Sequence, residues 1–118
     1  MRRQTIAVLL VGQSAAFAAW WTVLLVVPAS RAYFHVHEPS LLAFWLADAA
    51  VIATSLAAAF AVWRRLAWAP AAAWLAAGAT GYAALYCIAL WLSTGACAIG
   101  AITMTASAIL GITLARST

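Results

Sequence analysis

The two histidines of this 118-residue chain, His35 and His37, stand two positions apart in the segment 31–40 and are followed by Glu38. In an extended segment, side chains two positions apart point the same way, so both imidazoles could bind one metal ion. Glu38 or Asp48 would supply a third ligand of a type that first-row metals accept. Because two histidines rarely hold a metal alone, a partner chain would have to complete this site. The competing interpretations are a solvated or interfacial loop, and a contact with a partner or a lipid-like substrate.

Asp48 is the one carboxylate inside an apolar segment. It lies seven residues into the segment 41–63, roughly 10 Å from its border at 1.5 Å per helical residue. A charged side chain at that depth is unfavourable in lipid, so we expect Asp48 to face other helices or to be paired. The hypotheses are a buried contact with Gln13, a tyrosine or Arg31, a proton-carrying or ligand-contacting role, and subunit-interface pairing. The other candidates for ligand or proton binding are Gln13, Ser55, Tyr82 and Tyr86.

Cys87 and Cys97 flank the short polar turn 93–95. If two straight helices meet at this turn, the Cα atoms of the cysteines lie roughly 10 Å apart, beyond the ~7 Å limit for a disulfide. We therefore expect both cysteines to behave as small apolar residues.

The composition indicates which elements must hold these residues. The chain is 69% hydrophobic and 7% charged, with a mean hydropathy of +1.06, whereas soluble domains carry about 25% charged residues. Each of four apolar segments is close to the ~20 residues that cross a bilayer as a helix. They are residues 5–27, 41–63, 70–92 and 96–115. Because the connections are short, we predict an all-α integral membrane protein: one domain, 1–118, built as an up-down-up-down bundle of four transmembrane helices.

The arginines predict the orientation of this bundle. Arg31 falls in the loop 31–40 with the histidines, whereas the other arginines all fall on the opposite side. The positive-inside rule then places both termini in the cytoplasm, and we expect a bacterial inner membrane. The net charge of +4 is attributed to these membrane-border arginines, which can also meet anionic lipid, so no nucleic-acid partner is expected. The arginines opposite Arg31 are Arg2, Arg3, Arg64, Arg65 and Arg116.

Small residues form stripes on the last two apolar segments. Stripes of this kind let helices approach closely in lipid, so we expect tight helix packing, self-association, or contact with other membrane subunits. A substrate path is the alternative interpretation. The stripes are Gly100, Thr103, Ser107 and Gly111, and Gly78 with Gly81, Tyr82 and Tyr86.

No arrangement of residues typical of soluble enzymes occurs in the sequence, and no cofactor is required by it. The first functional hypothesis is that the chain is an accessory or structural subunit of a larger membrane complex. This hypothesis favours a protein that is not an enzyme. The second is a small homo-oligomeric, proton-coupled transporter or channel that uses Asp48. The third is an intramembrane enzyme or redox subunit that binds a quinone, a metal or a lipid headgroup near His35, His37 and Asp48.

Overall fold

The computed structural model describes the backbone of residues 1–33 and 38–118, and the side chains of residues 1–31 and 44–118. This part of the chain is helical. The helices are α1 (Arg3–Val26), α2 (Pro28–Tyr33), α3 (Glu38–Arg64), α4 (Ala69–Thr94) and α5 (Ala98–Arg116). All but the short α2 contain a stretch long and apolar enough to cross a membrane.

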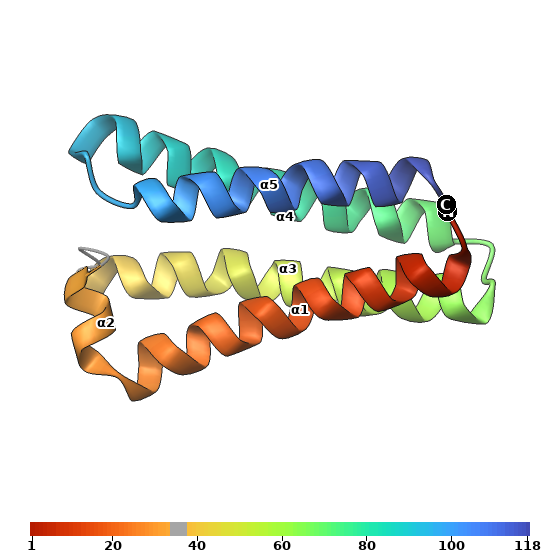
Figure 1. Cartoon of the computed structure of the whole chain (residues 1–118), viewed down its shortest axis with the longest axis horizontal. Coiled ribbons are helices and arrows are strands. Elements are labelled where there is room, and N and C mark those ends of the chain that lie inside the picture. Colours follow the sequence, from red (N-terminus) through yellow and green to blue (C-terminus); the bar gives the residue numbers. More distant parts are fainter. Residues whose placement is uncertain (34–37) are drawn as a thin grey trace.

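The four long helices form an antiparallel bundle (Figure 1). Along the bundle, α1 packs on α3, α3 packs on α4, and α4 packs on α5. Both chain termini and the α3–α4 connection lie at one end, here called the terminal end. The short helix α2 and the α4–α5 turn lie at the opposite end, called the α2 end. The predicted four-helix architecture is therefore present.

The helix α2 is an element that the sequence analysis did not predict. It begins at Pro28, which is compatible with a first helical turn because the missing N–H has no helical partner there. Arg31 lies in its last turn and donates from Nε to the carbonyl oxygen of Leu24 at 2.8 Å. An arginine that bonds a carbonyl near a helix C-terminus satisfies a group that the helix leaves free. Part of the predicted loop therefore folds back against the end of α1.

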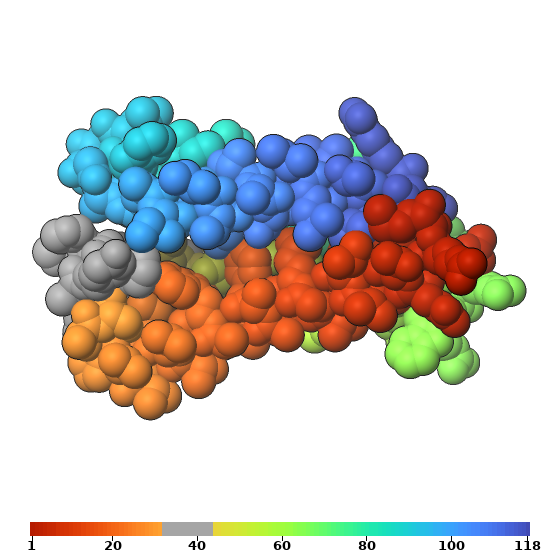
Figure 2. All heavy atoms as spheres, in the orientation of Figure 1, coloured from red at the N-terminus to blue at the C-terminus, as the bar shows by residue number. Residues whose placement is uncertain are grey.

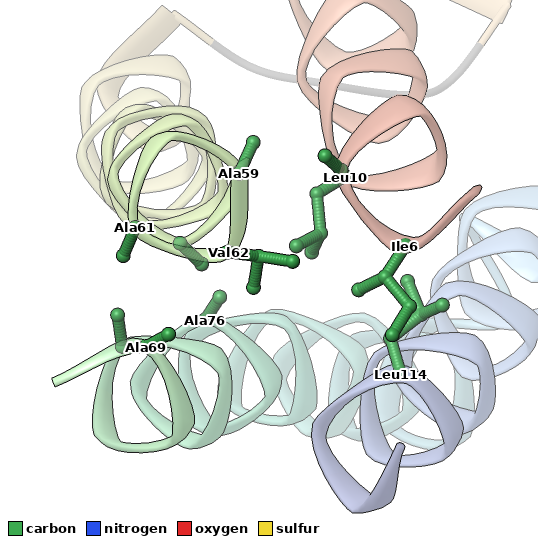
Figure 3. Close-up of a cluster of buried hydrophobic side chains, with 11 residues drawn as sticks. Ile6, Leu10, Ala59, Ala61, Val62, Ala69, Ala76 and Leu114 are labelled. Atoms are coloured by element: carbon green, nitrogen blue, oxygen red, sulfur yellow. The ribbon is translucent and has the colours of Figure 1, made fainter. Parts of the chain in front are cut away.

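The core of the terminal end joins all four long helices (Figure 3). Ile6 and Leu10 of α1 meet Val62 of α3, and Ile6 points toward Leu114 of α5. Most of the remaining members are alanines of α3 and α4, whose short side chains allow the helix backbones to approach closely. The terminal end is thus where α1 and α5 are held together.

Gly111 is a point of close approach between α4 and α5. A Cβ atom placed on Gly111 would lie 3.3 Å from the Cα atom of Ala77, tighter than ordinary van der Waals contact. The predicted close packing through the small-residue stripe is confirmed at this glycine. At Gly78, in contrast, a Cβ atom would meet nothing within 4 Å.

Candidate functional site

A cavity of about 260 Å³ lies in the half of the bundle nearer the α2 end. Helix α1 contributes aromatic walls from Phe17, Trp20 and Trp21, and α3 contributes Phe44 and Asp48. Apolar and aromatic walls around a few polar groups are the usual composition of a small-molecule site.

The cavity exists because α1 and α5 diverge. They make few contacts with each other, and Figure 1 shows them separating from the terminal end toward the α2 end. On the α5 side the lining includes Gly100, Thr103 and Ser107, whose small side chains leave the space unfilled. Figure 2 shows a depression between the two helices, through which atoms of α3 are visible. Three members of the predicted small-residue stripe therefore line a cavity instead of a helix contact.

Asp48 is the acidic group of this cavity. Its side chain is 4% exposed, and the indole Nε1 of Trp21 donates a hydrogen bond of 2.6 Å to its Oδ2. Among the described residues, no hydrogen bond to the other carboxylate oxygen, Oδ1, is found. One carboxylate oxygen is thus held by Trp21, and the other has no hydrogen-bond partner among the described residues.

The partner of Asp48 was missed in the sequence analysis, which considered Gln13, a tyrosine and Arg31. A buried tryptophan needs an acceptor for its N–H group, and Trp21 lies near the end of α1 at a depth similar to that of Asp48 in α3. The similar depth of the two residues, and the need of the indole N–H for an acceptor, were the sequence features that could have indicated this pair. The rotation of each helix about its axis, which brings the two side chains face to face, could not be read from depth.

Gln13 and Ser55 belong to the bundle interior and do not line the cavity. Gln13 donates from Nε2 to Thr80 Oγ1 at 2.9 Å, and Thr80 in turn donates to the carbonyl oxygen of Ala76 at 2.8 Å. The Oε1 atom of Gln13 and the hydroxyl of Ser55 are buried without a hydrogen-bond partner among the described residues. The hydrogen bond between Gln13 and Thr80 joins α1 to α4 in the middle of the bundle, away from Asp48.

We expect Thr80→Val to lower the free energy of unfolding by about 1 kcal/mol, because it removes the one acceptor of the buried Gln13 amide. Unfolding by dodecyl sulfate in mixed micelles, followed by circular dichroism, measures this change. Thr54→Val is the matched control, since the Thr54 hydroxyl bonds only its own helix backbone. The double variant Gln13→Leu/Thr80→Val should regain most of the loss. Equal stability of Thr80→Val and Thr54→Val would contradict the role of this hydrogen bond.

The two tyrosine candidates lie in different places. Tyr82 is 65% exposed and is not part of the cavity lining. Tyr86 is half-buried, and its ring meets the ring of Phe44 edge to face with centroids 4.7 Å apart. Because Phe44 lines the cavity, Tyr86 supports the cavity wall from behind.

The loop candidates lie largely beyond the described residues. His35 and His37 fall outside them, as does the side chain of Glu38. The predicted metal site at the two histidines therefore stays a prediction. Within the described part of the chain, no group of three or more His, Cys, Asp or Glu side chains is placed to hold a metal ion.

Cys87 and Cys97 are free thiols, and the predicted separation of their Cα atoms stays a prediction. Both sulfur atoms lie within 4 Å of the position that a Cβ atom would take on Gly100, and both thiols line the cavity. The prediction assumed that Cys97 already belongs to a straight helix. Instead α5 begins at Ala98, and Cys97 adopts a left-handed conformation with φ of 68° in the turn. The turn geometry therefore brings the sulfur atoms together.

Comparison with known proteins identifies no relative of this chain. No protein-family description matches the chain, and no curated protein or solved structure shows significant similarity to it.

Proposed function

We propose that this chain is a membrane-embedded binding protein for a lipid-soluble small molecule with a planar ring and a polar group. The observation that carries this proposal is the cavity between α1 and α5, in which apolar and aromatic walls surround the carboxylate of Asp48. A cavity of about 260 Å³ is at the small end of ligand pockets, which favours a compact ring over a bulky lipid headgroup.

The polar groups of the cavity define how such a molecule would be oriented. Trp21 holds Oδ2 of Asp48, so a hydroxyl or amine of the bound molecule would donate to Oδ1. The ring would then lie among Phe17, Trp20 and Phe44, where aromatic side chains favour offset or edge-to-face contacts. Because the depression opens between α1 and α5, the molecule would enter sideways from the hydrocarbon region of the membrane.

The proposal includes an orientation in the membrane. Arg2, Arg3 and Arg116 lie near the chain termini, and Arg64 and Arg65 lie at the α3–α4 connection, so these five arginines gather at the terminal end. The positive-inside rule supports a terminal end in the cytoplasm of a bacterial cell and a cavity in the outer half of its inner membrane.

This proposal is closest to the third functional hypothesis, an intramembrane enzyme or redox subunit that binds a quinone, a metal or a lipid headgroup near His35, His37 and Asp48. It is compatible with the first hypothesis, because a binding protein can also serve as a subunit of a larger complex. That assembly role stays a prediction, as does proton-coupled transport through Asp48.

The test is a titration of the full chain, in lipid nanodiscs, with 4-bromophenol. This compound is lipid-soluble, carries a hydroxyl donor on a planar ring, and quenches indole fluorescence on contact through its bromine atom. Trp20 and Trp21 line the cavity, so we expect a saturable quenching component from them. The variant Ala16→Phe should abolish this component, because Ala16 is an exposed residue that lines the cavity and phenylalanine would fill it.

The matched control is Ala15→Phe, which adds the same side chain at an exposed neighbouring position that does not line the cavity. Saturable quenching should persist in this variant. A purely linear quenching curve in the unmodified protein, or equal curves for the two phenylalanine variants, would overturn the proposed binding site.

A further inference from the structure

The thiols of Cys87 and Cys97 form a pair at the edge of the cavity. Cys87 is buried in α4, and Cys97 is half-buried in the turn that precedes α5. Both sulfur atoms lie within 4 Å of the position that a Cβ atom would take on Gly100, and both thiols line the same cavity as Asp48. Binding of a small molecule at Asp48 does not require two adjacent thiols, so their placement needs a separate explanation.

The local backbone holds this pair in place. Cys97 has a left-handed conformation that is unfavourable for a residue with a Cβ atom. The next helical turn provides space through Gly100, where a Cβ atom would lie 2.6 Å from Cys97 Sγ and 3.9 Å from Cys87 Sγ. Backbone strain of this kind concentrates at functional sites. A strained residue and a glycine thus both serve to place one sulfur atom beside the other.

We propose that Cys87 and Cys97 are a redox-active dithiol that reduces a quinone-class molecule bound in the cavity. In the reaction two S–H bonds break and one S–S bond forms. Two electrons and two protons pass to the quinone, whose two carbonyl oxygens become hydroxyls. The inference rests on the proposed function for the site of quinone binding, whereas the formation of a disulfide rests on the cysteine pair alone.

The position of the pair favours an oxidant that dissolves in the membrane. Cys87 is buried among apolar side chains and reaches open space through the cavity, which opens between α1 and α5. A quinone has the planar ring that suits the aromatic walls and accepts the two electrons that one dithiol releases. The product hydroquinone carries a hydroxyl that can donate a hydrogen bond to Oδ1 of Asp48.

The properties of Cys97 favour the first step and the return to the reduced state. The neighbouring thiol of Cys87 lowers the pKa of Cys97 below the usual value for a thiol, which favours the thiolate, the nucleophilic form. Cys97 is also half-buried at the α2 end of the bundle. A soluble dithiol could therefore reach the disulfide there and regenerate both thiols by exchange.

The test uses the reduced full chain in mild detergent with a decyl-chain benzoquinone whose ring positions are all substituted, so that thiols cannot remain attached to the ring. Absorbance reports hydroquinone, and a maleimide–polyethylene glycol gel shift reports free thiols. We expect one hydroquinone for each cysteine pair lost, and continued quinone reduction when dithiothreitol is supplied. The variants Cys87→Ser and Cys97→Ser should each lose protein-dependent quinone reduction. Equal rates in these variants and in the unmodified protein would overturn the proposal.

The variant Gly100→Ala tests the geometry without removing a thiol. Its methyl group would force Cys97 Sγ out of its position, and a displacement of about 1 Å in a reacting group can slow a reaction by up to about a hundredfold. We expect disulfide formation to slow about tenfold or more. Gly81→Ala is the matched control, because a Cβ atom at Gly81 meets nothing within 4 Å. Equal rates for the two variants would contradict the positioning role of Gly100.

Two further measurements test the dithiol and the cavity independently of each other. Diamide, a soluble thiol oxidant, should oxidise the pair in both the unmodified protein and Ala16→Phe, whereas the quinone should oxidise it only in the former. Saturable 4-bromophenol binding without quinone reduction would overturn the redox inference and leave the proposed function standing. Oxidation by diamide without saturable 4-bromophenol binding would overturn the proposed function, and with it the quinone step. Thiols that stay free under diamide would overturn the redox pair itself.

Discussion

Replacing Asp48 with asparagine is expected to weaken the binding of 4-bromophenol by about tenfold to a hundredfold. The carboxylate accepts the indole N–H of Trp21 on one oxygen and has a second oxygen for the hydroxyl of the bound phenol. An asparagine amide has only one oxygen. Whichever way the amide is oriented, either the indole or the phenol loses its acceptor. An unpaired buried donor is unfavourable by about 1–3 kcal/mol, which corresponds to the expected range in affinity.

The measurement is the saturable component of tryptophan quenching in nanodiscs. In the unliganded protein the amide oxygen can still accept from Trp21, so we expect Asp48→Asn to fold as the unmodified protein does. Ser55→Ala is the matched control, because Ser55 is a buried polar residue of the same helix whose hydroxyl has no hydrogen-bond partner among the described residues. It should leave the affinity unchanged. An unchanged affinity in Asp48→Asn would show that this carboxylate does not contact the bound molecule.

The architecture could be predicted because a lipid environment, which the composition favours, would impose it. A chain with 7% charged residues and four long apolar segments has to satisfy its backbone hydrogen bonds within helices of membrane-spanning length. The burial of Asp48 follows from the same argument. Hydropathy therefore predicted both the elements and the polar residue around which the candidate site is built.

The assembly of the site could not be predicted in the same way. The contact between Trp21 and Asp48 depends on how α1 and α3 are rotated about their axes, and apolar composition on every face leaves that rotation unspecified. The contact between Cys87 and Cys97 depends on a left-handed residue in a short turn, whereas the prediction used straight helices. The cavity depends on the divergence of α1 from α5, which no single segment encodes.

The small-residue stripe on α5 shows why one sequence pattern can have two structural outcomes. Near the α2 end, Gly100, Thr103 and Ser107 line open space. Near the terminal end, Gly111 packs against Ala77 of α4. The spacing of the stripe is continuous, but its surroundings differ. Gly111 faces α4, whereas the residues nearer the α2 end face the space that opens where α1 diverges from α5. Small residues permit close packing, and the surrounding helices determine whether it occurs.

The variant Gly111→Leu is expected to destabilise the bundle by about 3 kcal/mol, at the upper end of the range for overpacked cores. The atom that a new Cβ would meet first is the Cα of Ala77, at 3.3 Å. A backbone atom cannot rotate away as the end of a flexible side chain can. To accommodate leucine, α5 has to move off α4, which also disturbs the contact of Leu114 with Ile6 in the terminal core.

Dodecyl sulfate unfolding in mixed micelles, followed by circular dichroism, measures this loss against the matched variant Gly78→Leu. That glycine lies in α4 and would have no atom within 4 Å of a new Cβ, so leucine there faces lipid and adds helix propensity. We expect Gly78→Leu to change stability by no more than about 0.5 kcal/mol or to raise it slightly. Similar losses in both variants would mean that leucine destabilises the helix in which it stands and does not act on the contact between α4 and α5. A loss confined to Gly111→Leu would show that the close contact between α4 and α5 stabilises the bundle.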